Sequence, residues 1–183
     1  MSTLPQASSI IQELERTLQG IRPGEMEKLA KQIMQAEQIF VAGAGRSGLM
    51  MKAFAMRLMH MGLRAYVVGE TVTPGITERD LLLIGSGSGE TKTLVSMAAK
   101  ASSIGAAIGV VTIVPASTLG TVASLTVTIP AVTKDNPAGG SNQPMGTLFE
   151  QSLLIMLDTI VMNLMETLQL EGTGMYGNHA NLE

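Results

Sequence analysis

The sequence contains no cysteine and no tryptophan, and it has only two histidines, two tyrosines and three phenylalanines among 183 residues. The lack of cysteine excludes disulfide bonds, thiolate catalysis and cysteine-ligated metals. Two histidines supply few further ligands for a transition metal. We therefore expect no metal centre.

Charge is also scarce. Charged residues make up 15% of the chain, hydrophobic residues make up 45%, and the formal net charge at pH 7 is -3. Nucleic acids and anionic membranes are bound through basic faces, so we expect neither as a partner. A surface this poor in charge predicts that part of it is covered by other subunits of a homo-oligomer.

Long apolar runs are missing as well. No stretch approaches about 18 consecutive uncharged apolar residues, and residues 1–10 lack the basic start and apolar core of a signal peptide. We expect a soluble, cytoplasmic protein. The length predicts one domain over residues 1–183, with a helical extension at about 1–36, a core at about 37–170 and a tail at about 171–183.

The core alternates short apolar runs with helical patterns. The predicted strands are 38–42, 64–68, 81–84, 107–114 and 125–129, and the predicted core helices are 47–60, 93–103 and about 145–168. The strands are continuously apolar, which is typical of parallel strands covered on both faces. The sequence therefore predicts an α/β fold, a three-layer αβα sandwich with a five-stranded parallel sheet. A helix pair precedes this core, one helix over residues 5–20 and one from Pro23, and the long helix closes it.

A loop of glycines and serines, Gly85-Ser86-Gly87-Ser88-Gly89, separates the third predicted strand from helix-forming sequence that begins at Glu90. Unpaired N–H groups and the dipole at a helix start favour an anion, and the hydroxyls of Ser86, Ser88 and Thr91 add donors. The spacing does not match a Walker A loop, so a phosphate monoester fits better than a nucleoside triphosphate. A flexible turn without a ligand is the alternative that this loop alone leaves open.

A second loop, Gly43-Ala44-Gly45-Arg46-Ser47-Gly48, matches the dinucleotide fingerprint, and Glu70 follows about twenty residues later. However, one five-stranded domain uses nearly the whole chain and leaves no room for a separate substrate domain. Because ligands sit at the carboxyl ends of parallel strands, both glycine loops are expected to face one crevice. Ser47 and the 86–91 loop would then hold opposite ends of one small phosphorylated molecule.

Glu150 is the candidate general base, because it lies in the first turn of the long predicted helix, directly after the turn-rich loop 133–145. Acidic residues are favoured in any first helical turn, so a structural role stays open for it. His179, in the tail, is the second candidate, whereas His60 fits a structural position. Four cations are each able to touch a phosphate without any being assigned: Arg46, Lys52, Lys92 and Lys134.

These motifs together resemble the sugar isomerase (SIS) domain family, through the serine-rich loop 86–91. Further segments, 42–48, 56–62, 143–151 and 179–183, are similar to the branch that isomerises phosphorylated 3-hexuloses. The resemblance implies a cofactor-free enzyme that converts D-arabino-hex-3-ulose 6-phosphate to fructose 6-phosphate in the ribulose monophosphate pathway of formaldehyde fixation. It also implies a homotetramer that is functionally coupled to a hexulose-phosphate synthase.

The same resemblance implies a role for each candidate residue. Glu150 would remove the C2 proton of the substrate, which would give a cis-enediolate intermediate. The same residue would then return the proton at C3. His179 would assist ring opening, in its own or a neighbouring subunit's site. Substrate would be held by Ser47, Ser86, Gly87, Ser88, Gly89, Glu90 and Thr91. Two alternatives stay open: an aldose-ketose isomerase, for example of arabinose 5-phosphate, and a phosphosugar-sensing module without catalysis.

Overall fold

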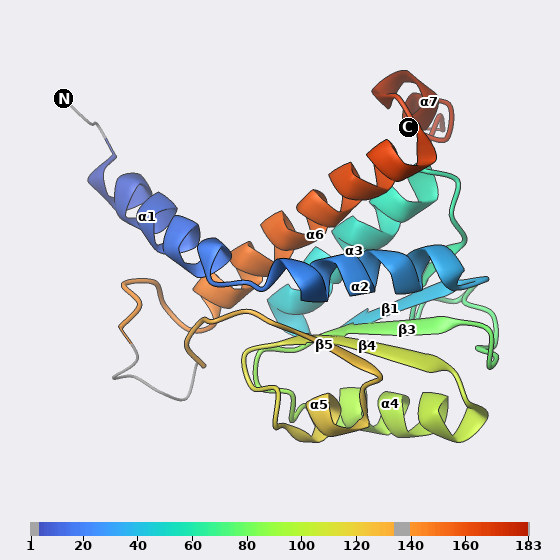
Figure 1. Cartoon of the computed structure of the whole chain (residues 1–183), viewed down its shortest axis with the longest axis horizontal. Helices are drawn as coiled ribbons and strands as arrows, with labels where there is room; N and C mark the ends of the chain where they lie inside the picture. The colour runs from blue at the N-terminus through green and yellow to red at the C-terminus, as the bar shows by residue number, and fades with distance from the viewer. Residues whose placement is uncertain (1–3, 134–139, 183) are drawn as a thin grey trace.

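The computed structural model describes residues 4–133 and 140–182. Five strands form one all-parallel sheet in the order β2-β1-β3-β4-β5 (Figure 1). The strands are β1 (Ile39–Gly43), β2 (Ala65–Val67), β3 (Leu81–Gly85), β4 (Ala107–Thr112) and β5 (Leu125–Thr128). This sheet confirms the predicted fold class.

Helices cover both faces of the sheet. On one face lie α2 (Pro23–Gln35), α3 (Gly45–His60) and α6 (Thr147–Leu168), and α1 (Pro5–Gln19) packs against α6. On the other face lie α4 (Lys92–Ile104) and α5 (Thr118–Val122), and the short α7 (Gly172–Tyr176) follows α6 in the tail. The sheet has a hydrophobic core on each face: the first core lies under α2, α3 and α6, and the second lies under α4 and α5. Neighbouring residues of β3 point to opposite faces, because Leu83 belongs to the first core and Leu82 to the second. This is why the strands are apolar throughout.

The strand order brings the two glycine loops together. The chain runs from β1 outward to β2 and then returns to the other side of β1 as β3. The loops after β1 and β3 therefore lie side by side at the carboxyl edge of the sheet, at the point where the strand order reverses. Open α/β sheets bind their ligands at this switch point.

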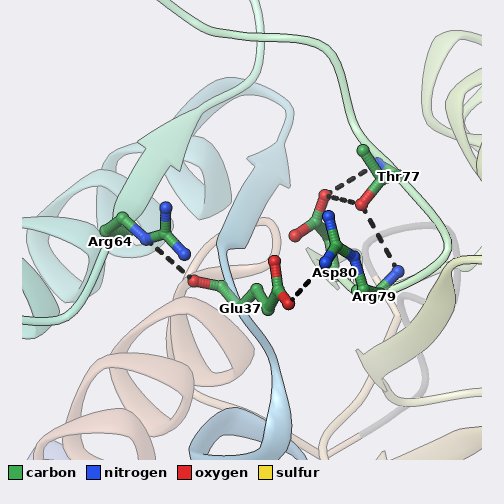
Figure 2. A network of polar contacts seen from close by, with 5 residues as sticks. All are labelled: Glu37, Arg64, Thr77, Arg79 and Asp80. Atoms are coloured by element: carbon green, nitrogen blue, oxygen red, sulfur yellow. Dashed lines mark hydrogen bonds and ion pairs between the residues drawn. The ribbon is translucent and has the colours of Figure 1, made fainter.

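A polar network ties the strand starts together at the opposite edge of the sheet (Figure 2). The side chain of Glu37 pairs with Arg79 at 2.9 Å, and its backbone carbonyl accepts a hydrogen bond from Arg64 Nε at 3.2 Å. Asp80 is buried, and its Oδ2 accepts from both the N–H and the hydroxyl of Thr77, at 2.7 and 2.8 Å. These bonds fix the residues that lead into β1, β2 and β3.

The long helix α6 is the main helix of the first core. Its predicted apolar side is buried at Phe149, Leu153, Met156, Ile160 and Leu164. Within the described residues it is the one helix long and apolar enough to cross a membrane, and half of its most apolar window is buried inside the fold. The buried half packs with α3 and the sheet, whereas Ile155 and Met162 remain exposed.

The structure differs from the sequence prediction at several element ends. The helix α6 begins at Thr147 instead of about residue 145, because Met145 has a left-handed φ of 57°. The strand β4 ends at Thr112, whose hydroxyl donates to the carbonyl of Gly87 and accepts from the N–H of Val114. The five-residue helices α5 and α7 are not predicted by the sequence, because one turn is too short to show a 3.6-residue period.

Candidate active site

A cavity of about 350 Å³ opens at the switch point, a volume in the range of small-molecule sites. Its walls come from Ala44 and the first turn of α3, the β3–α4 loop, the residue after β4, the β5–α6 segment and the start of α6. The lining residues are Ala44, Gly45, Arg46, Ser47, Gly85, Ser86, Gly87, Ser88, Thr91, Leu94, Ile113, Thr133, Met145, Gly146, Phe149 and Glu150. Both glycine loops therefore face one crevice, as the sequence predicted.

Six of the nine residues proposed from the sequence line this cavity: Ser47, Ser86, Gly87, Ser88, Thr91 and Glu150. The β3–α4 loop is held in shape from inside. Ser86 Oγ accepts from the N–H of Gly89 at 3.2 Å, and Ser88 Oγ accepts from the N–H of Glu90 at 3.3 Å. The carbonyl of Gly87 accepts from the Ile113 N–H, so β4 holds the loop from the other side. A preformed loop of hydroxyls at the start of α4 suits a phosphate group.

Gly89 and Glu90 lie outside the cavity lining. Gly89 has a φ of +67°, and a Cβ there would lie 1.9 Å from Ser117 Oγ, so the position requires glycine for packing. The Glu90 carboxylate accepts hydrogen bonds from the Thr118 N–H at 2.7 Å and the Thr118 hydroxyl at 2.8 Å. These bonds lower the pKa of Glu90. In this structure both residues join the loop to α5 and its cap.

Glu150 lines the same cavity as the β3–α4 loop. Its Oε2 lies 3.1 Å from Nη1 of Arg46, and the side chains of Glu150 and Arg46 are 17% and 47% exposed. The neighbouring Phe149 is buried and packs on Gly87, where a Cβ would come within 3.3 Å of its ring. This packing sets the start of α6 against the loop, and the cavity holds a carboxylate and a guanidinium side by side.

The remaining features of the dinucleotide fingerprint are used within the chain. Glu70 pairs with Lys52 of α3 at 2.8 Å and does not line the cavity.

Of the other cations considered as phosphate contacts, Lys92 does not line the cavity, and Lys134 lies outside the described residues. Within residues 4–133 and 140–182, no group of three or more His, Asp or Glu side chains is arranged to hold a metal.

His179 is not part of this cavity. The helix α3 begins at the cavity and ends at His60, and its 16 residues span about 24 Å. Figure 1 shows α3 and α6 running side by side toward α7 at that far end. There the His179 ring stacks on His60 with centroids 5.3 Å apart, and Asn178 donates to the His60 carbonyl at 3.0 Å. Within one chain, therefore, His179 does not reach the cavity.

His60 is buried, more deeply than the partly buried surface position that the sequence predicts. Burial lowers its pKa, and the neighbouring Arg57 and His179 add to that effect. Arg57 Nη1 lies 3.3 Å from His60 Nδ1. A neutral His60 ring is therefore the form that the folded chain favours, and it supplies a flat surface on which the tail packs.

Several lining residues have no role assigned from the sequence. Arg46 is marked there only as a possible phosphate contact, and its pairing with Glu150 joins residues 104 apart in the chain. Thr133, Met145 and Gly146 belong to the predicted loop and its end, and they line the cavity because that loop leads into α6. For Thr133, Met145 and Gly146, the sequence gives one indication of a functional role, which is the run of turn-forming residues before Glu150.

The chain is similar to known proteins over its whole length. The family model for the SIS domain matches residues 32–157. A Bacillus subtilis protein named 3-hexulose-6-phosphate isomerase is 48% identical over 185 residues, which cover 100% of both chains. A Mycobacterium gastri protein of the same name is 42% identical over 177 residues, which cover 96% of this chain and 89% of the relative.

Solved structures agree with this similarity. One is a hypothetical protein from Methanococcus jannaschii, whose crystal structure is described as inferring a molecular function of 3-hexulose-6-phosphate isomerase. It has a TM-score of 0.86 and 32% identity to this chain, and the match covers 97% of this chain and 99% of that one. Another, described as a hypothetical protein, has a TM-score of 0.90 and 37% identity, and the match covers 100% of this chain and 98% of that one.

Proposed function

The chain belongs to the SIS domain family, and we propose that it is a soluble, cytoplasmic isomerase that interconverts D-arabino-hex-3-ulose 6-phosphate and fructose 6-phosphate. The full-length similarity to proteins named 3-hexulose-6-phosphate isomerase supports this substrate. The observation that carries the proposal is the cavity itself, whose lining combines a hydroxyl-rich loop at the start of α4 with the carboxylate of Glu150. In this function the protein needs no cofactor and acts after a hexulose-phosphate synthase in the ribulose monophosphate pathway.

The phosphate of the substrate is bound by the β3–α4 loop. The hydroxyls of Ser86, Ser88 and Thr91 and the amino terminus of α4 provide donors and a favourable dipole on one wall of the cavity. Ser47, in the first turn of α3, contacts the sugar. Binding the phosphate at one wall places the carbon chain between the loop and α6, where Glu150 is located.

Glu150 transfers the proton between the two carbons. Its carboxylate breaks the C2–H bond of the 3-ketose, and the electron pair forms the C2–C3 double bond of a cis-enediolate. The same group returns the proton to C3, and the O2 proton moves to O3, which leaves the carbonyl at C2. The Arg46 guanidinium, 3.1 Å from Glu150, lies close enough to stabilise the developing negative charge.

Hydrogen exchange in fructose 6-phosphate tests this function. In deuterated buffer the purified protein is expected to replace the C3 hydrogen of fructose 6-phosphate, because the reverse reaction removes that proton to form the enediolate. Proton NMR follows the loss of the C3 signal over time.

Two results would contradict the proposal. Exchange at C1 in place of C3 would move the protein to the aldose-ketose isomerases, such as those acting on arabinose 5-phosphate. Binding of fructose 6-phosphate without exchange at any carbon would identify a sensing module. Phosphosugar binding itself is measured separately by calorimetry, so an inactive preparation is distinguished from a non-catalytic protein.

We further propose that the protein is a homotetramer in which His179 serves the site of a neighbouring subunit and assists ring opening there. The outer faces of three helices support the first part, because large apolar side chains are exposed on them. They are Leu4 at the start of α1 and Ile11 within it, Leu49, Met56 and Met59 of α3, and Ile155 and Met162 of α6. The position of His179, far from the cavity of its own chain, supports the second part.

Mixing two inactive variants tests both parts. Glu150→Gln and His179→Gln are each expected to be inactive alone, and subunit exchange between them is expected to restore a fraction of wild-type turnover. In a mixed assembly some sites receive Glu150 from one chain and His179 from the other. Light scattering gives the mass of the assembly, and no recovery of turnover despite subunit exchange would show that His179 does not act across an interface.

A further inference from the structure

A single carboxylate on α1 holds the segment that leads into the catalytic end of α6. That segment, residues 141–144, is called the strap here. Figure 1 shows α1 extending from the body of the molecule near the start of α6, and the two helices are in contact. Glu13 of α1 is separated from the strap by about 130 residues of sequence and meets it directly.

Glu13 accepts a hydrogen bond from each of three consecutive strap residues. Its Oε1 accepts from the N–H of Asn142 at 2.6 Å. Its Oε2 accepts from Ser141 Oγ at 3.1 Å and from Gln143 Nε2 at 3.0 Å. A carboxylate that accepts three hydrogen bonds forms strong, charge-assisted contacts, so it fixes both the backbone and the side chains of the strap.

The strap in turn fixes the first turn of α6. The carbonyl of Pro144 accepts from the N–H of Thr147 at 3.2 Å and from its hydroxyl at 2.6 Å. Between them, Met145 has a left-handed φ of 57°, a conformation that a non-glycine residue keeps only where its surroundings impose it. The Glu150 N–H then donates to the carbonyl of Gly146 at 3.0 Å. Displacing the strap therefore displaces Glu150.

We propose that Glu13 is a positioning residue for catalysis, which acts through the strap to hold Glu150 at the reacting carbons. This inference rests on the proposed isomerase function. It assigns to α1 a part in the chemistry, although α1 contributes no residue to the cavity lining.

The charge state of Glu13 suits this role. Partial burial alone would raise the pKa of the Glu13 carboxyl, but the hydrogen bonds from Asn142, Gln143 and Ser141, together with the nearby Arg16, outweigh it and lower the pKa. Glu13 is therefore ionised at neutral pH, where its carboxylate accepts all three bonds.

Glu13→Ala tests the proposal through turnover. We expect kcat for the hexulose phosphate to fall about 10- to 100-fold, with KM changed about threefold or less, because a small displacement of a catalytic group costs rate more than binding. Glu13→Gln is expected to recover most of that loss. Its amide can keep the bond to Asn142, and its NH2 group can donate to Gln143 Oε1, which is buried without a partner in this structure.

Two further variants keep the test decisive. Glu15→Gln on the same helix is the matched control, since Glu15 accepts only from Gln19 of its own helix among the described residues, and it is expected to leave kcat unchanged. Ser141→Ala weakens the strap from its own side without altering α1. A double-mutant cycle with Glu13→Ala is expected to show losses in kcat that are not additive, because both changes act on one contact.

The proposal is overturned if folded Glu13→Ala keeps kcat within twofold of wild type, if only KM rises, or if the Glu13 and Ser141 effects on kcat are additive. If Glu13→Ala does not fold, the kcat values of Glu13→Gln and Ser141→Ala are each compared with that of the wild type. The proposal is overturned if both variants have the wild-type kcat. Failure of the proposed function is a different result, because wild-type protein would then not exchange the C3 hydrogen of fructose 6-phosphate.

Discussion

Glu150→Gln is expected to lower kcat by about three orders of magnitude, within the range that general acid-base catalysis contributes, while KM changes little. The glutamine has the same shape, and its carbonyl oxygen can still accept the hydrogen bond that Arg46 donates to Glu150 at 3.1 Å. The β3–α4 loop, which we propose binds the phosphate, is untouched. The variant therefore loses the proton acceptor and keeps the binding surface. Steady-state kinetics with the hexulose phosphate measures both constants.

Asp158→Asn provides the matched control for this variant. Asp158 lies on the exposed side of α6, two turns beyond Glu150, so the same change of charge on the same helix is expected to leave kcat unchanged. A Glu150→Gln protein that kept kcat within tenfold of wild type would remove Glu150 from the proton transfer. The base would then have to be sought elsewhere on the cavity wall.

Most of the fold was predictable because it depends on local patterns. Each apolar run such as Leu81–Ile84 marks a strand buried on both faces, and the glycines that follow mark a turn into a helix. The parallel arrangement then places both loops at one edge, so the proximity of Ser47 to the 86–91 loop followed from topology alone. Glu150 was found for a similar reason, as a carboxylate in the first turn of a helix that follows a long loop.

Contacts between distant segments were not predictable in the same way. Glu90 is adjacent in sequence to the serine loop, yet its carboxylate binds Thr118 at the start of α5, a helix too short to leave a pattern. The tail gave no indication that His179 would stack on His60. The bonds between Glu13 and the strap arise from tertiary packing of an ordinary surface-type glutamate. Such pairings join residues that are far apart in the sequence, and they leave no periodic pattern of apolar or polar residues from which they could be predicted.

The three glycines at the junction of β1 and α3 have different roles, which the fingerprint alone does not separate. Gly45 has a φ of +57°, and a Cβ at this position would have no atom within 4 Å, so Gly45 serves the backbone turn at the cavity. Gly43 and Gly48 instead let the strand and helix backbones touch. A Cβ on Gly48 would lie 2.7 Å from the Gly43 carbonyl oxygen, and a Cβ on Gly43 would lie 2.9 Å from the Gly48 Cα.

Gly48→Ala is therefore expected to lower the free energy of unfolding by about 1 to 3 kcal/mol, the usual cost of overpacking a core. The atoms that the new methyl group meets belong to the backbone of β1, so no side chain can rotate away and the helix has to move. That movement also shifts the adjacent Ser47 and Arg46, which line the cavity, so turnover is expected to fall with stability. Urea unfolding at a fixed protein concentration measures the first effect.

Gly24→Ala separates this packing effect from the general preference of helices for alanine. Gly24 lies in the first turn of α2 with no atom within 4 Å of a Cβ, so alanine there is expected to leave stability unchanged or to raise it by up to about 1 kcal/mol. Both variants make the same chemical change within a helix, and only Gly48 opposes a strand backbone. Equal unfolding midpoints for the two variants would show that the β1–α3 contact yields without cost. The close approach of strand and helix would then not be what fixes Ser47 at the cavity.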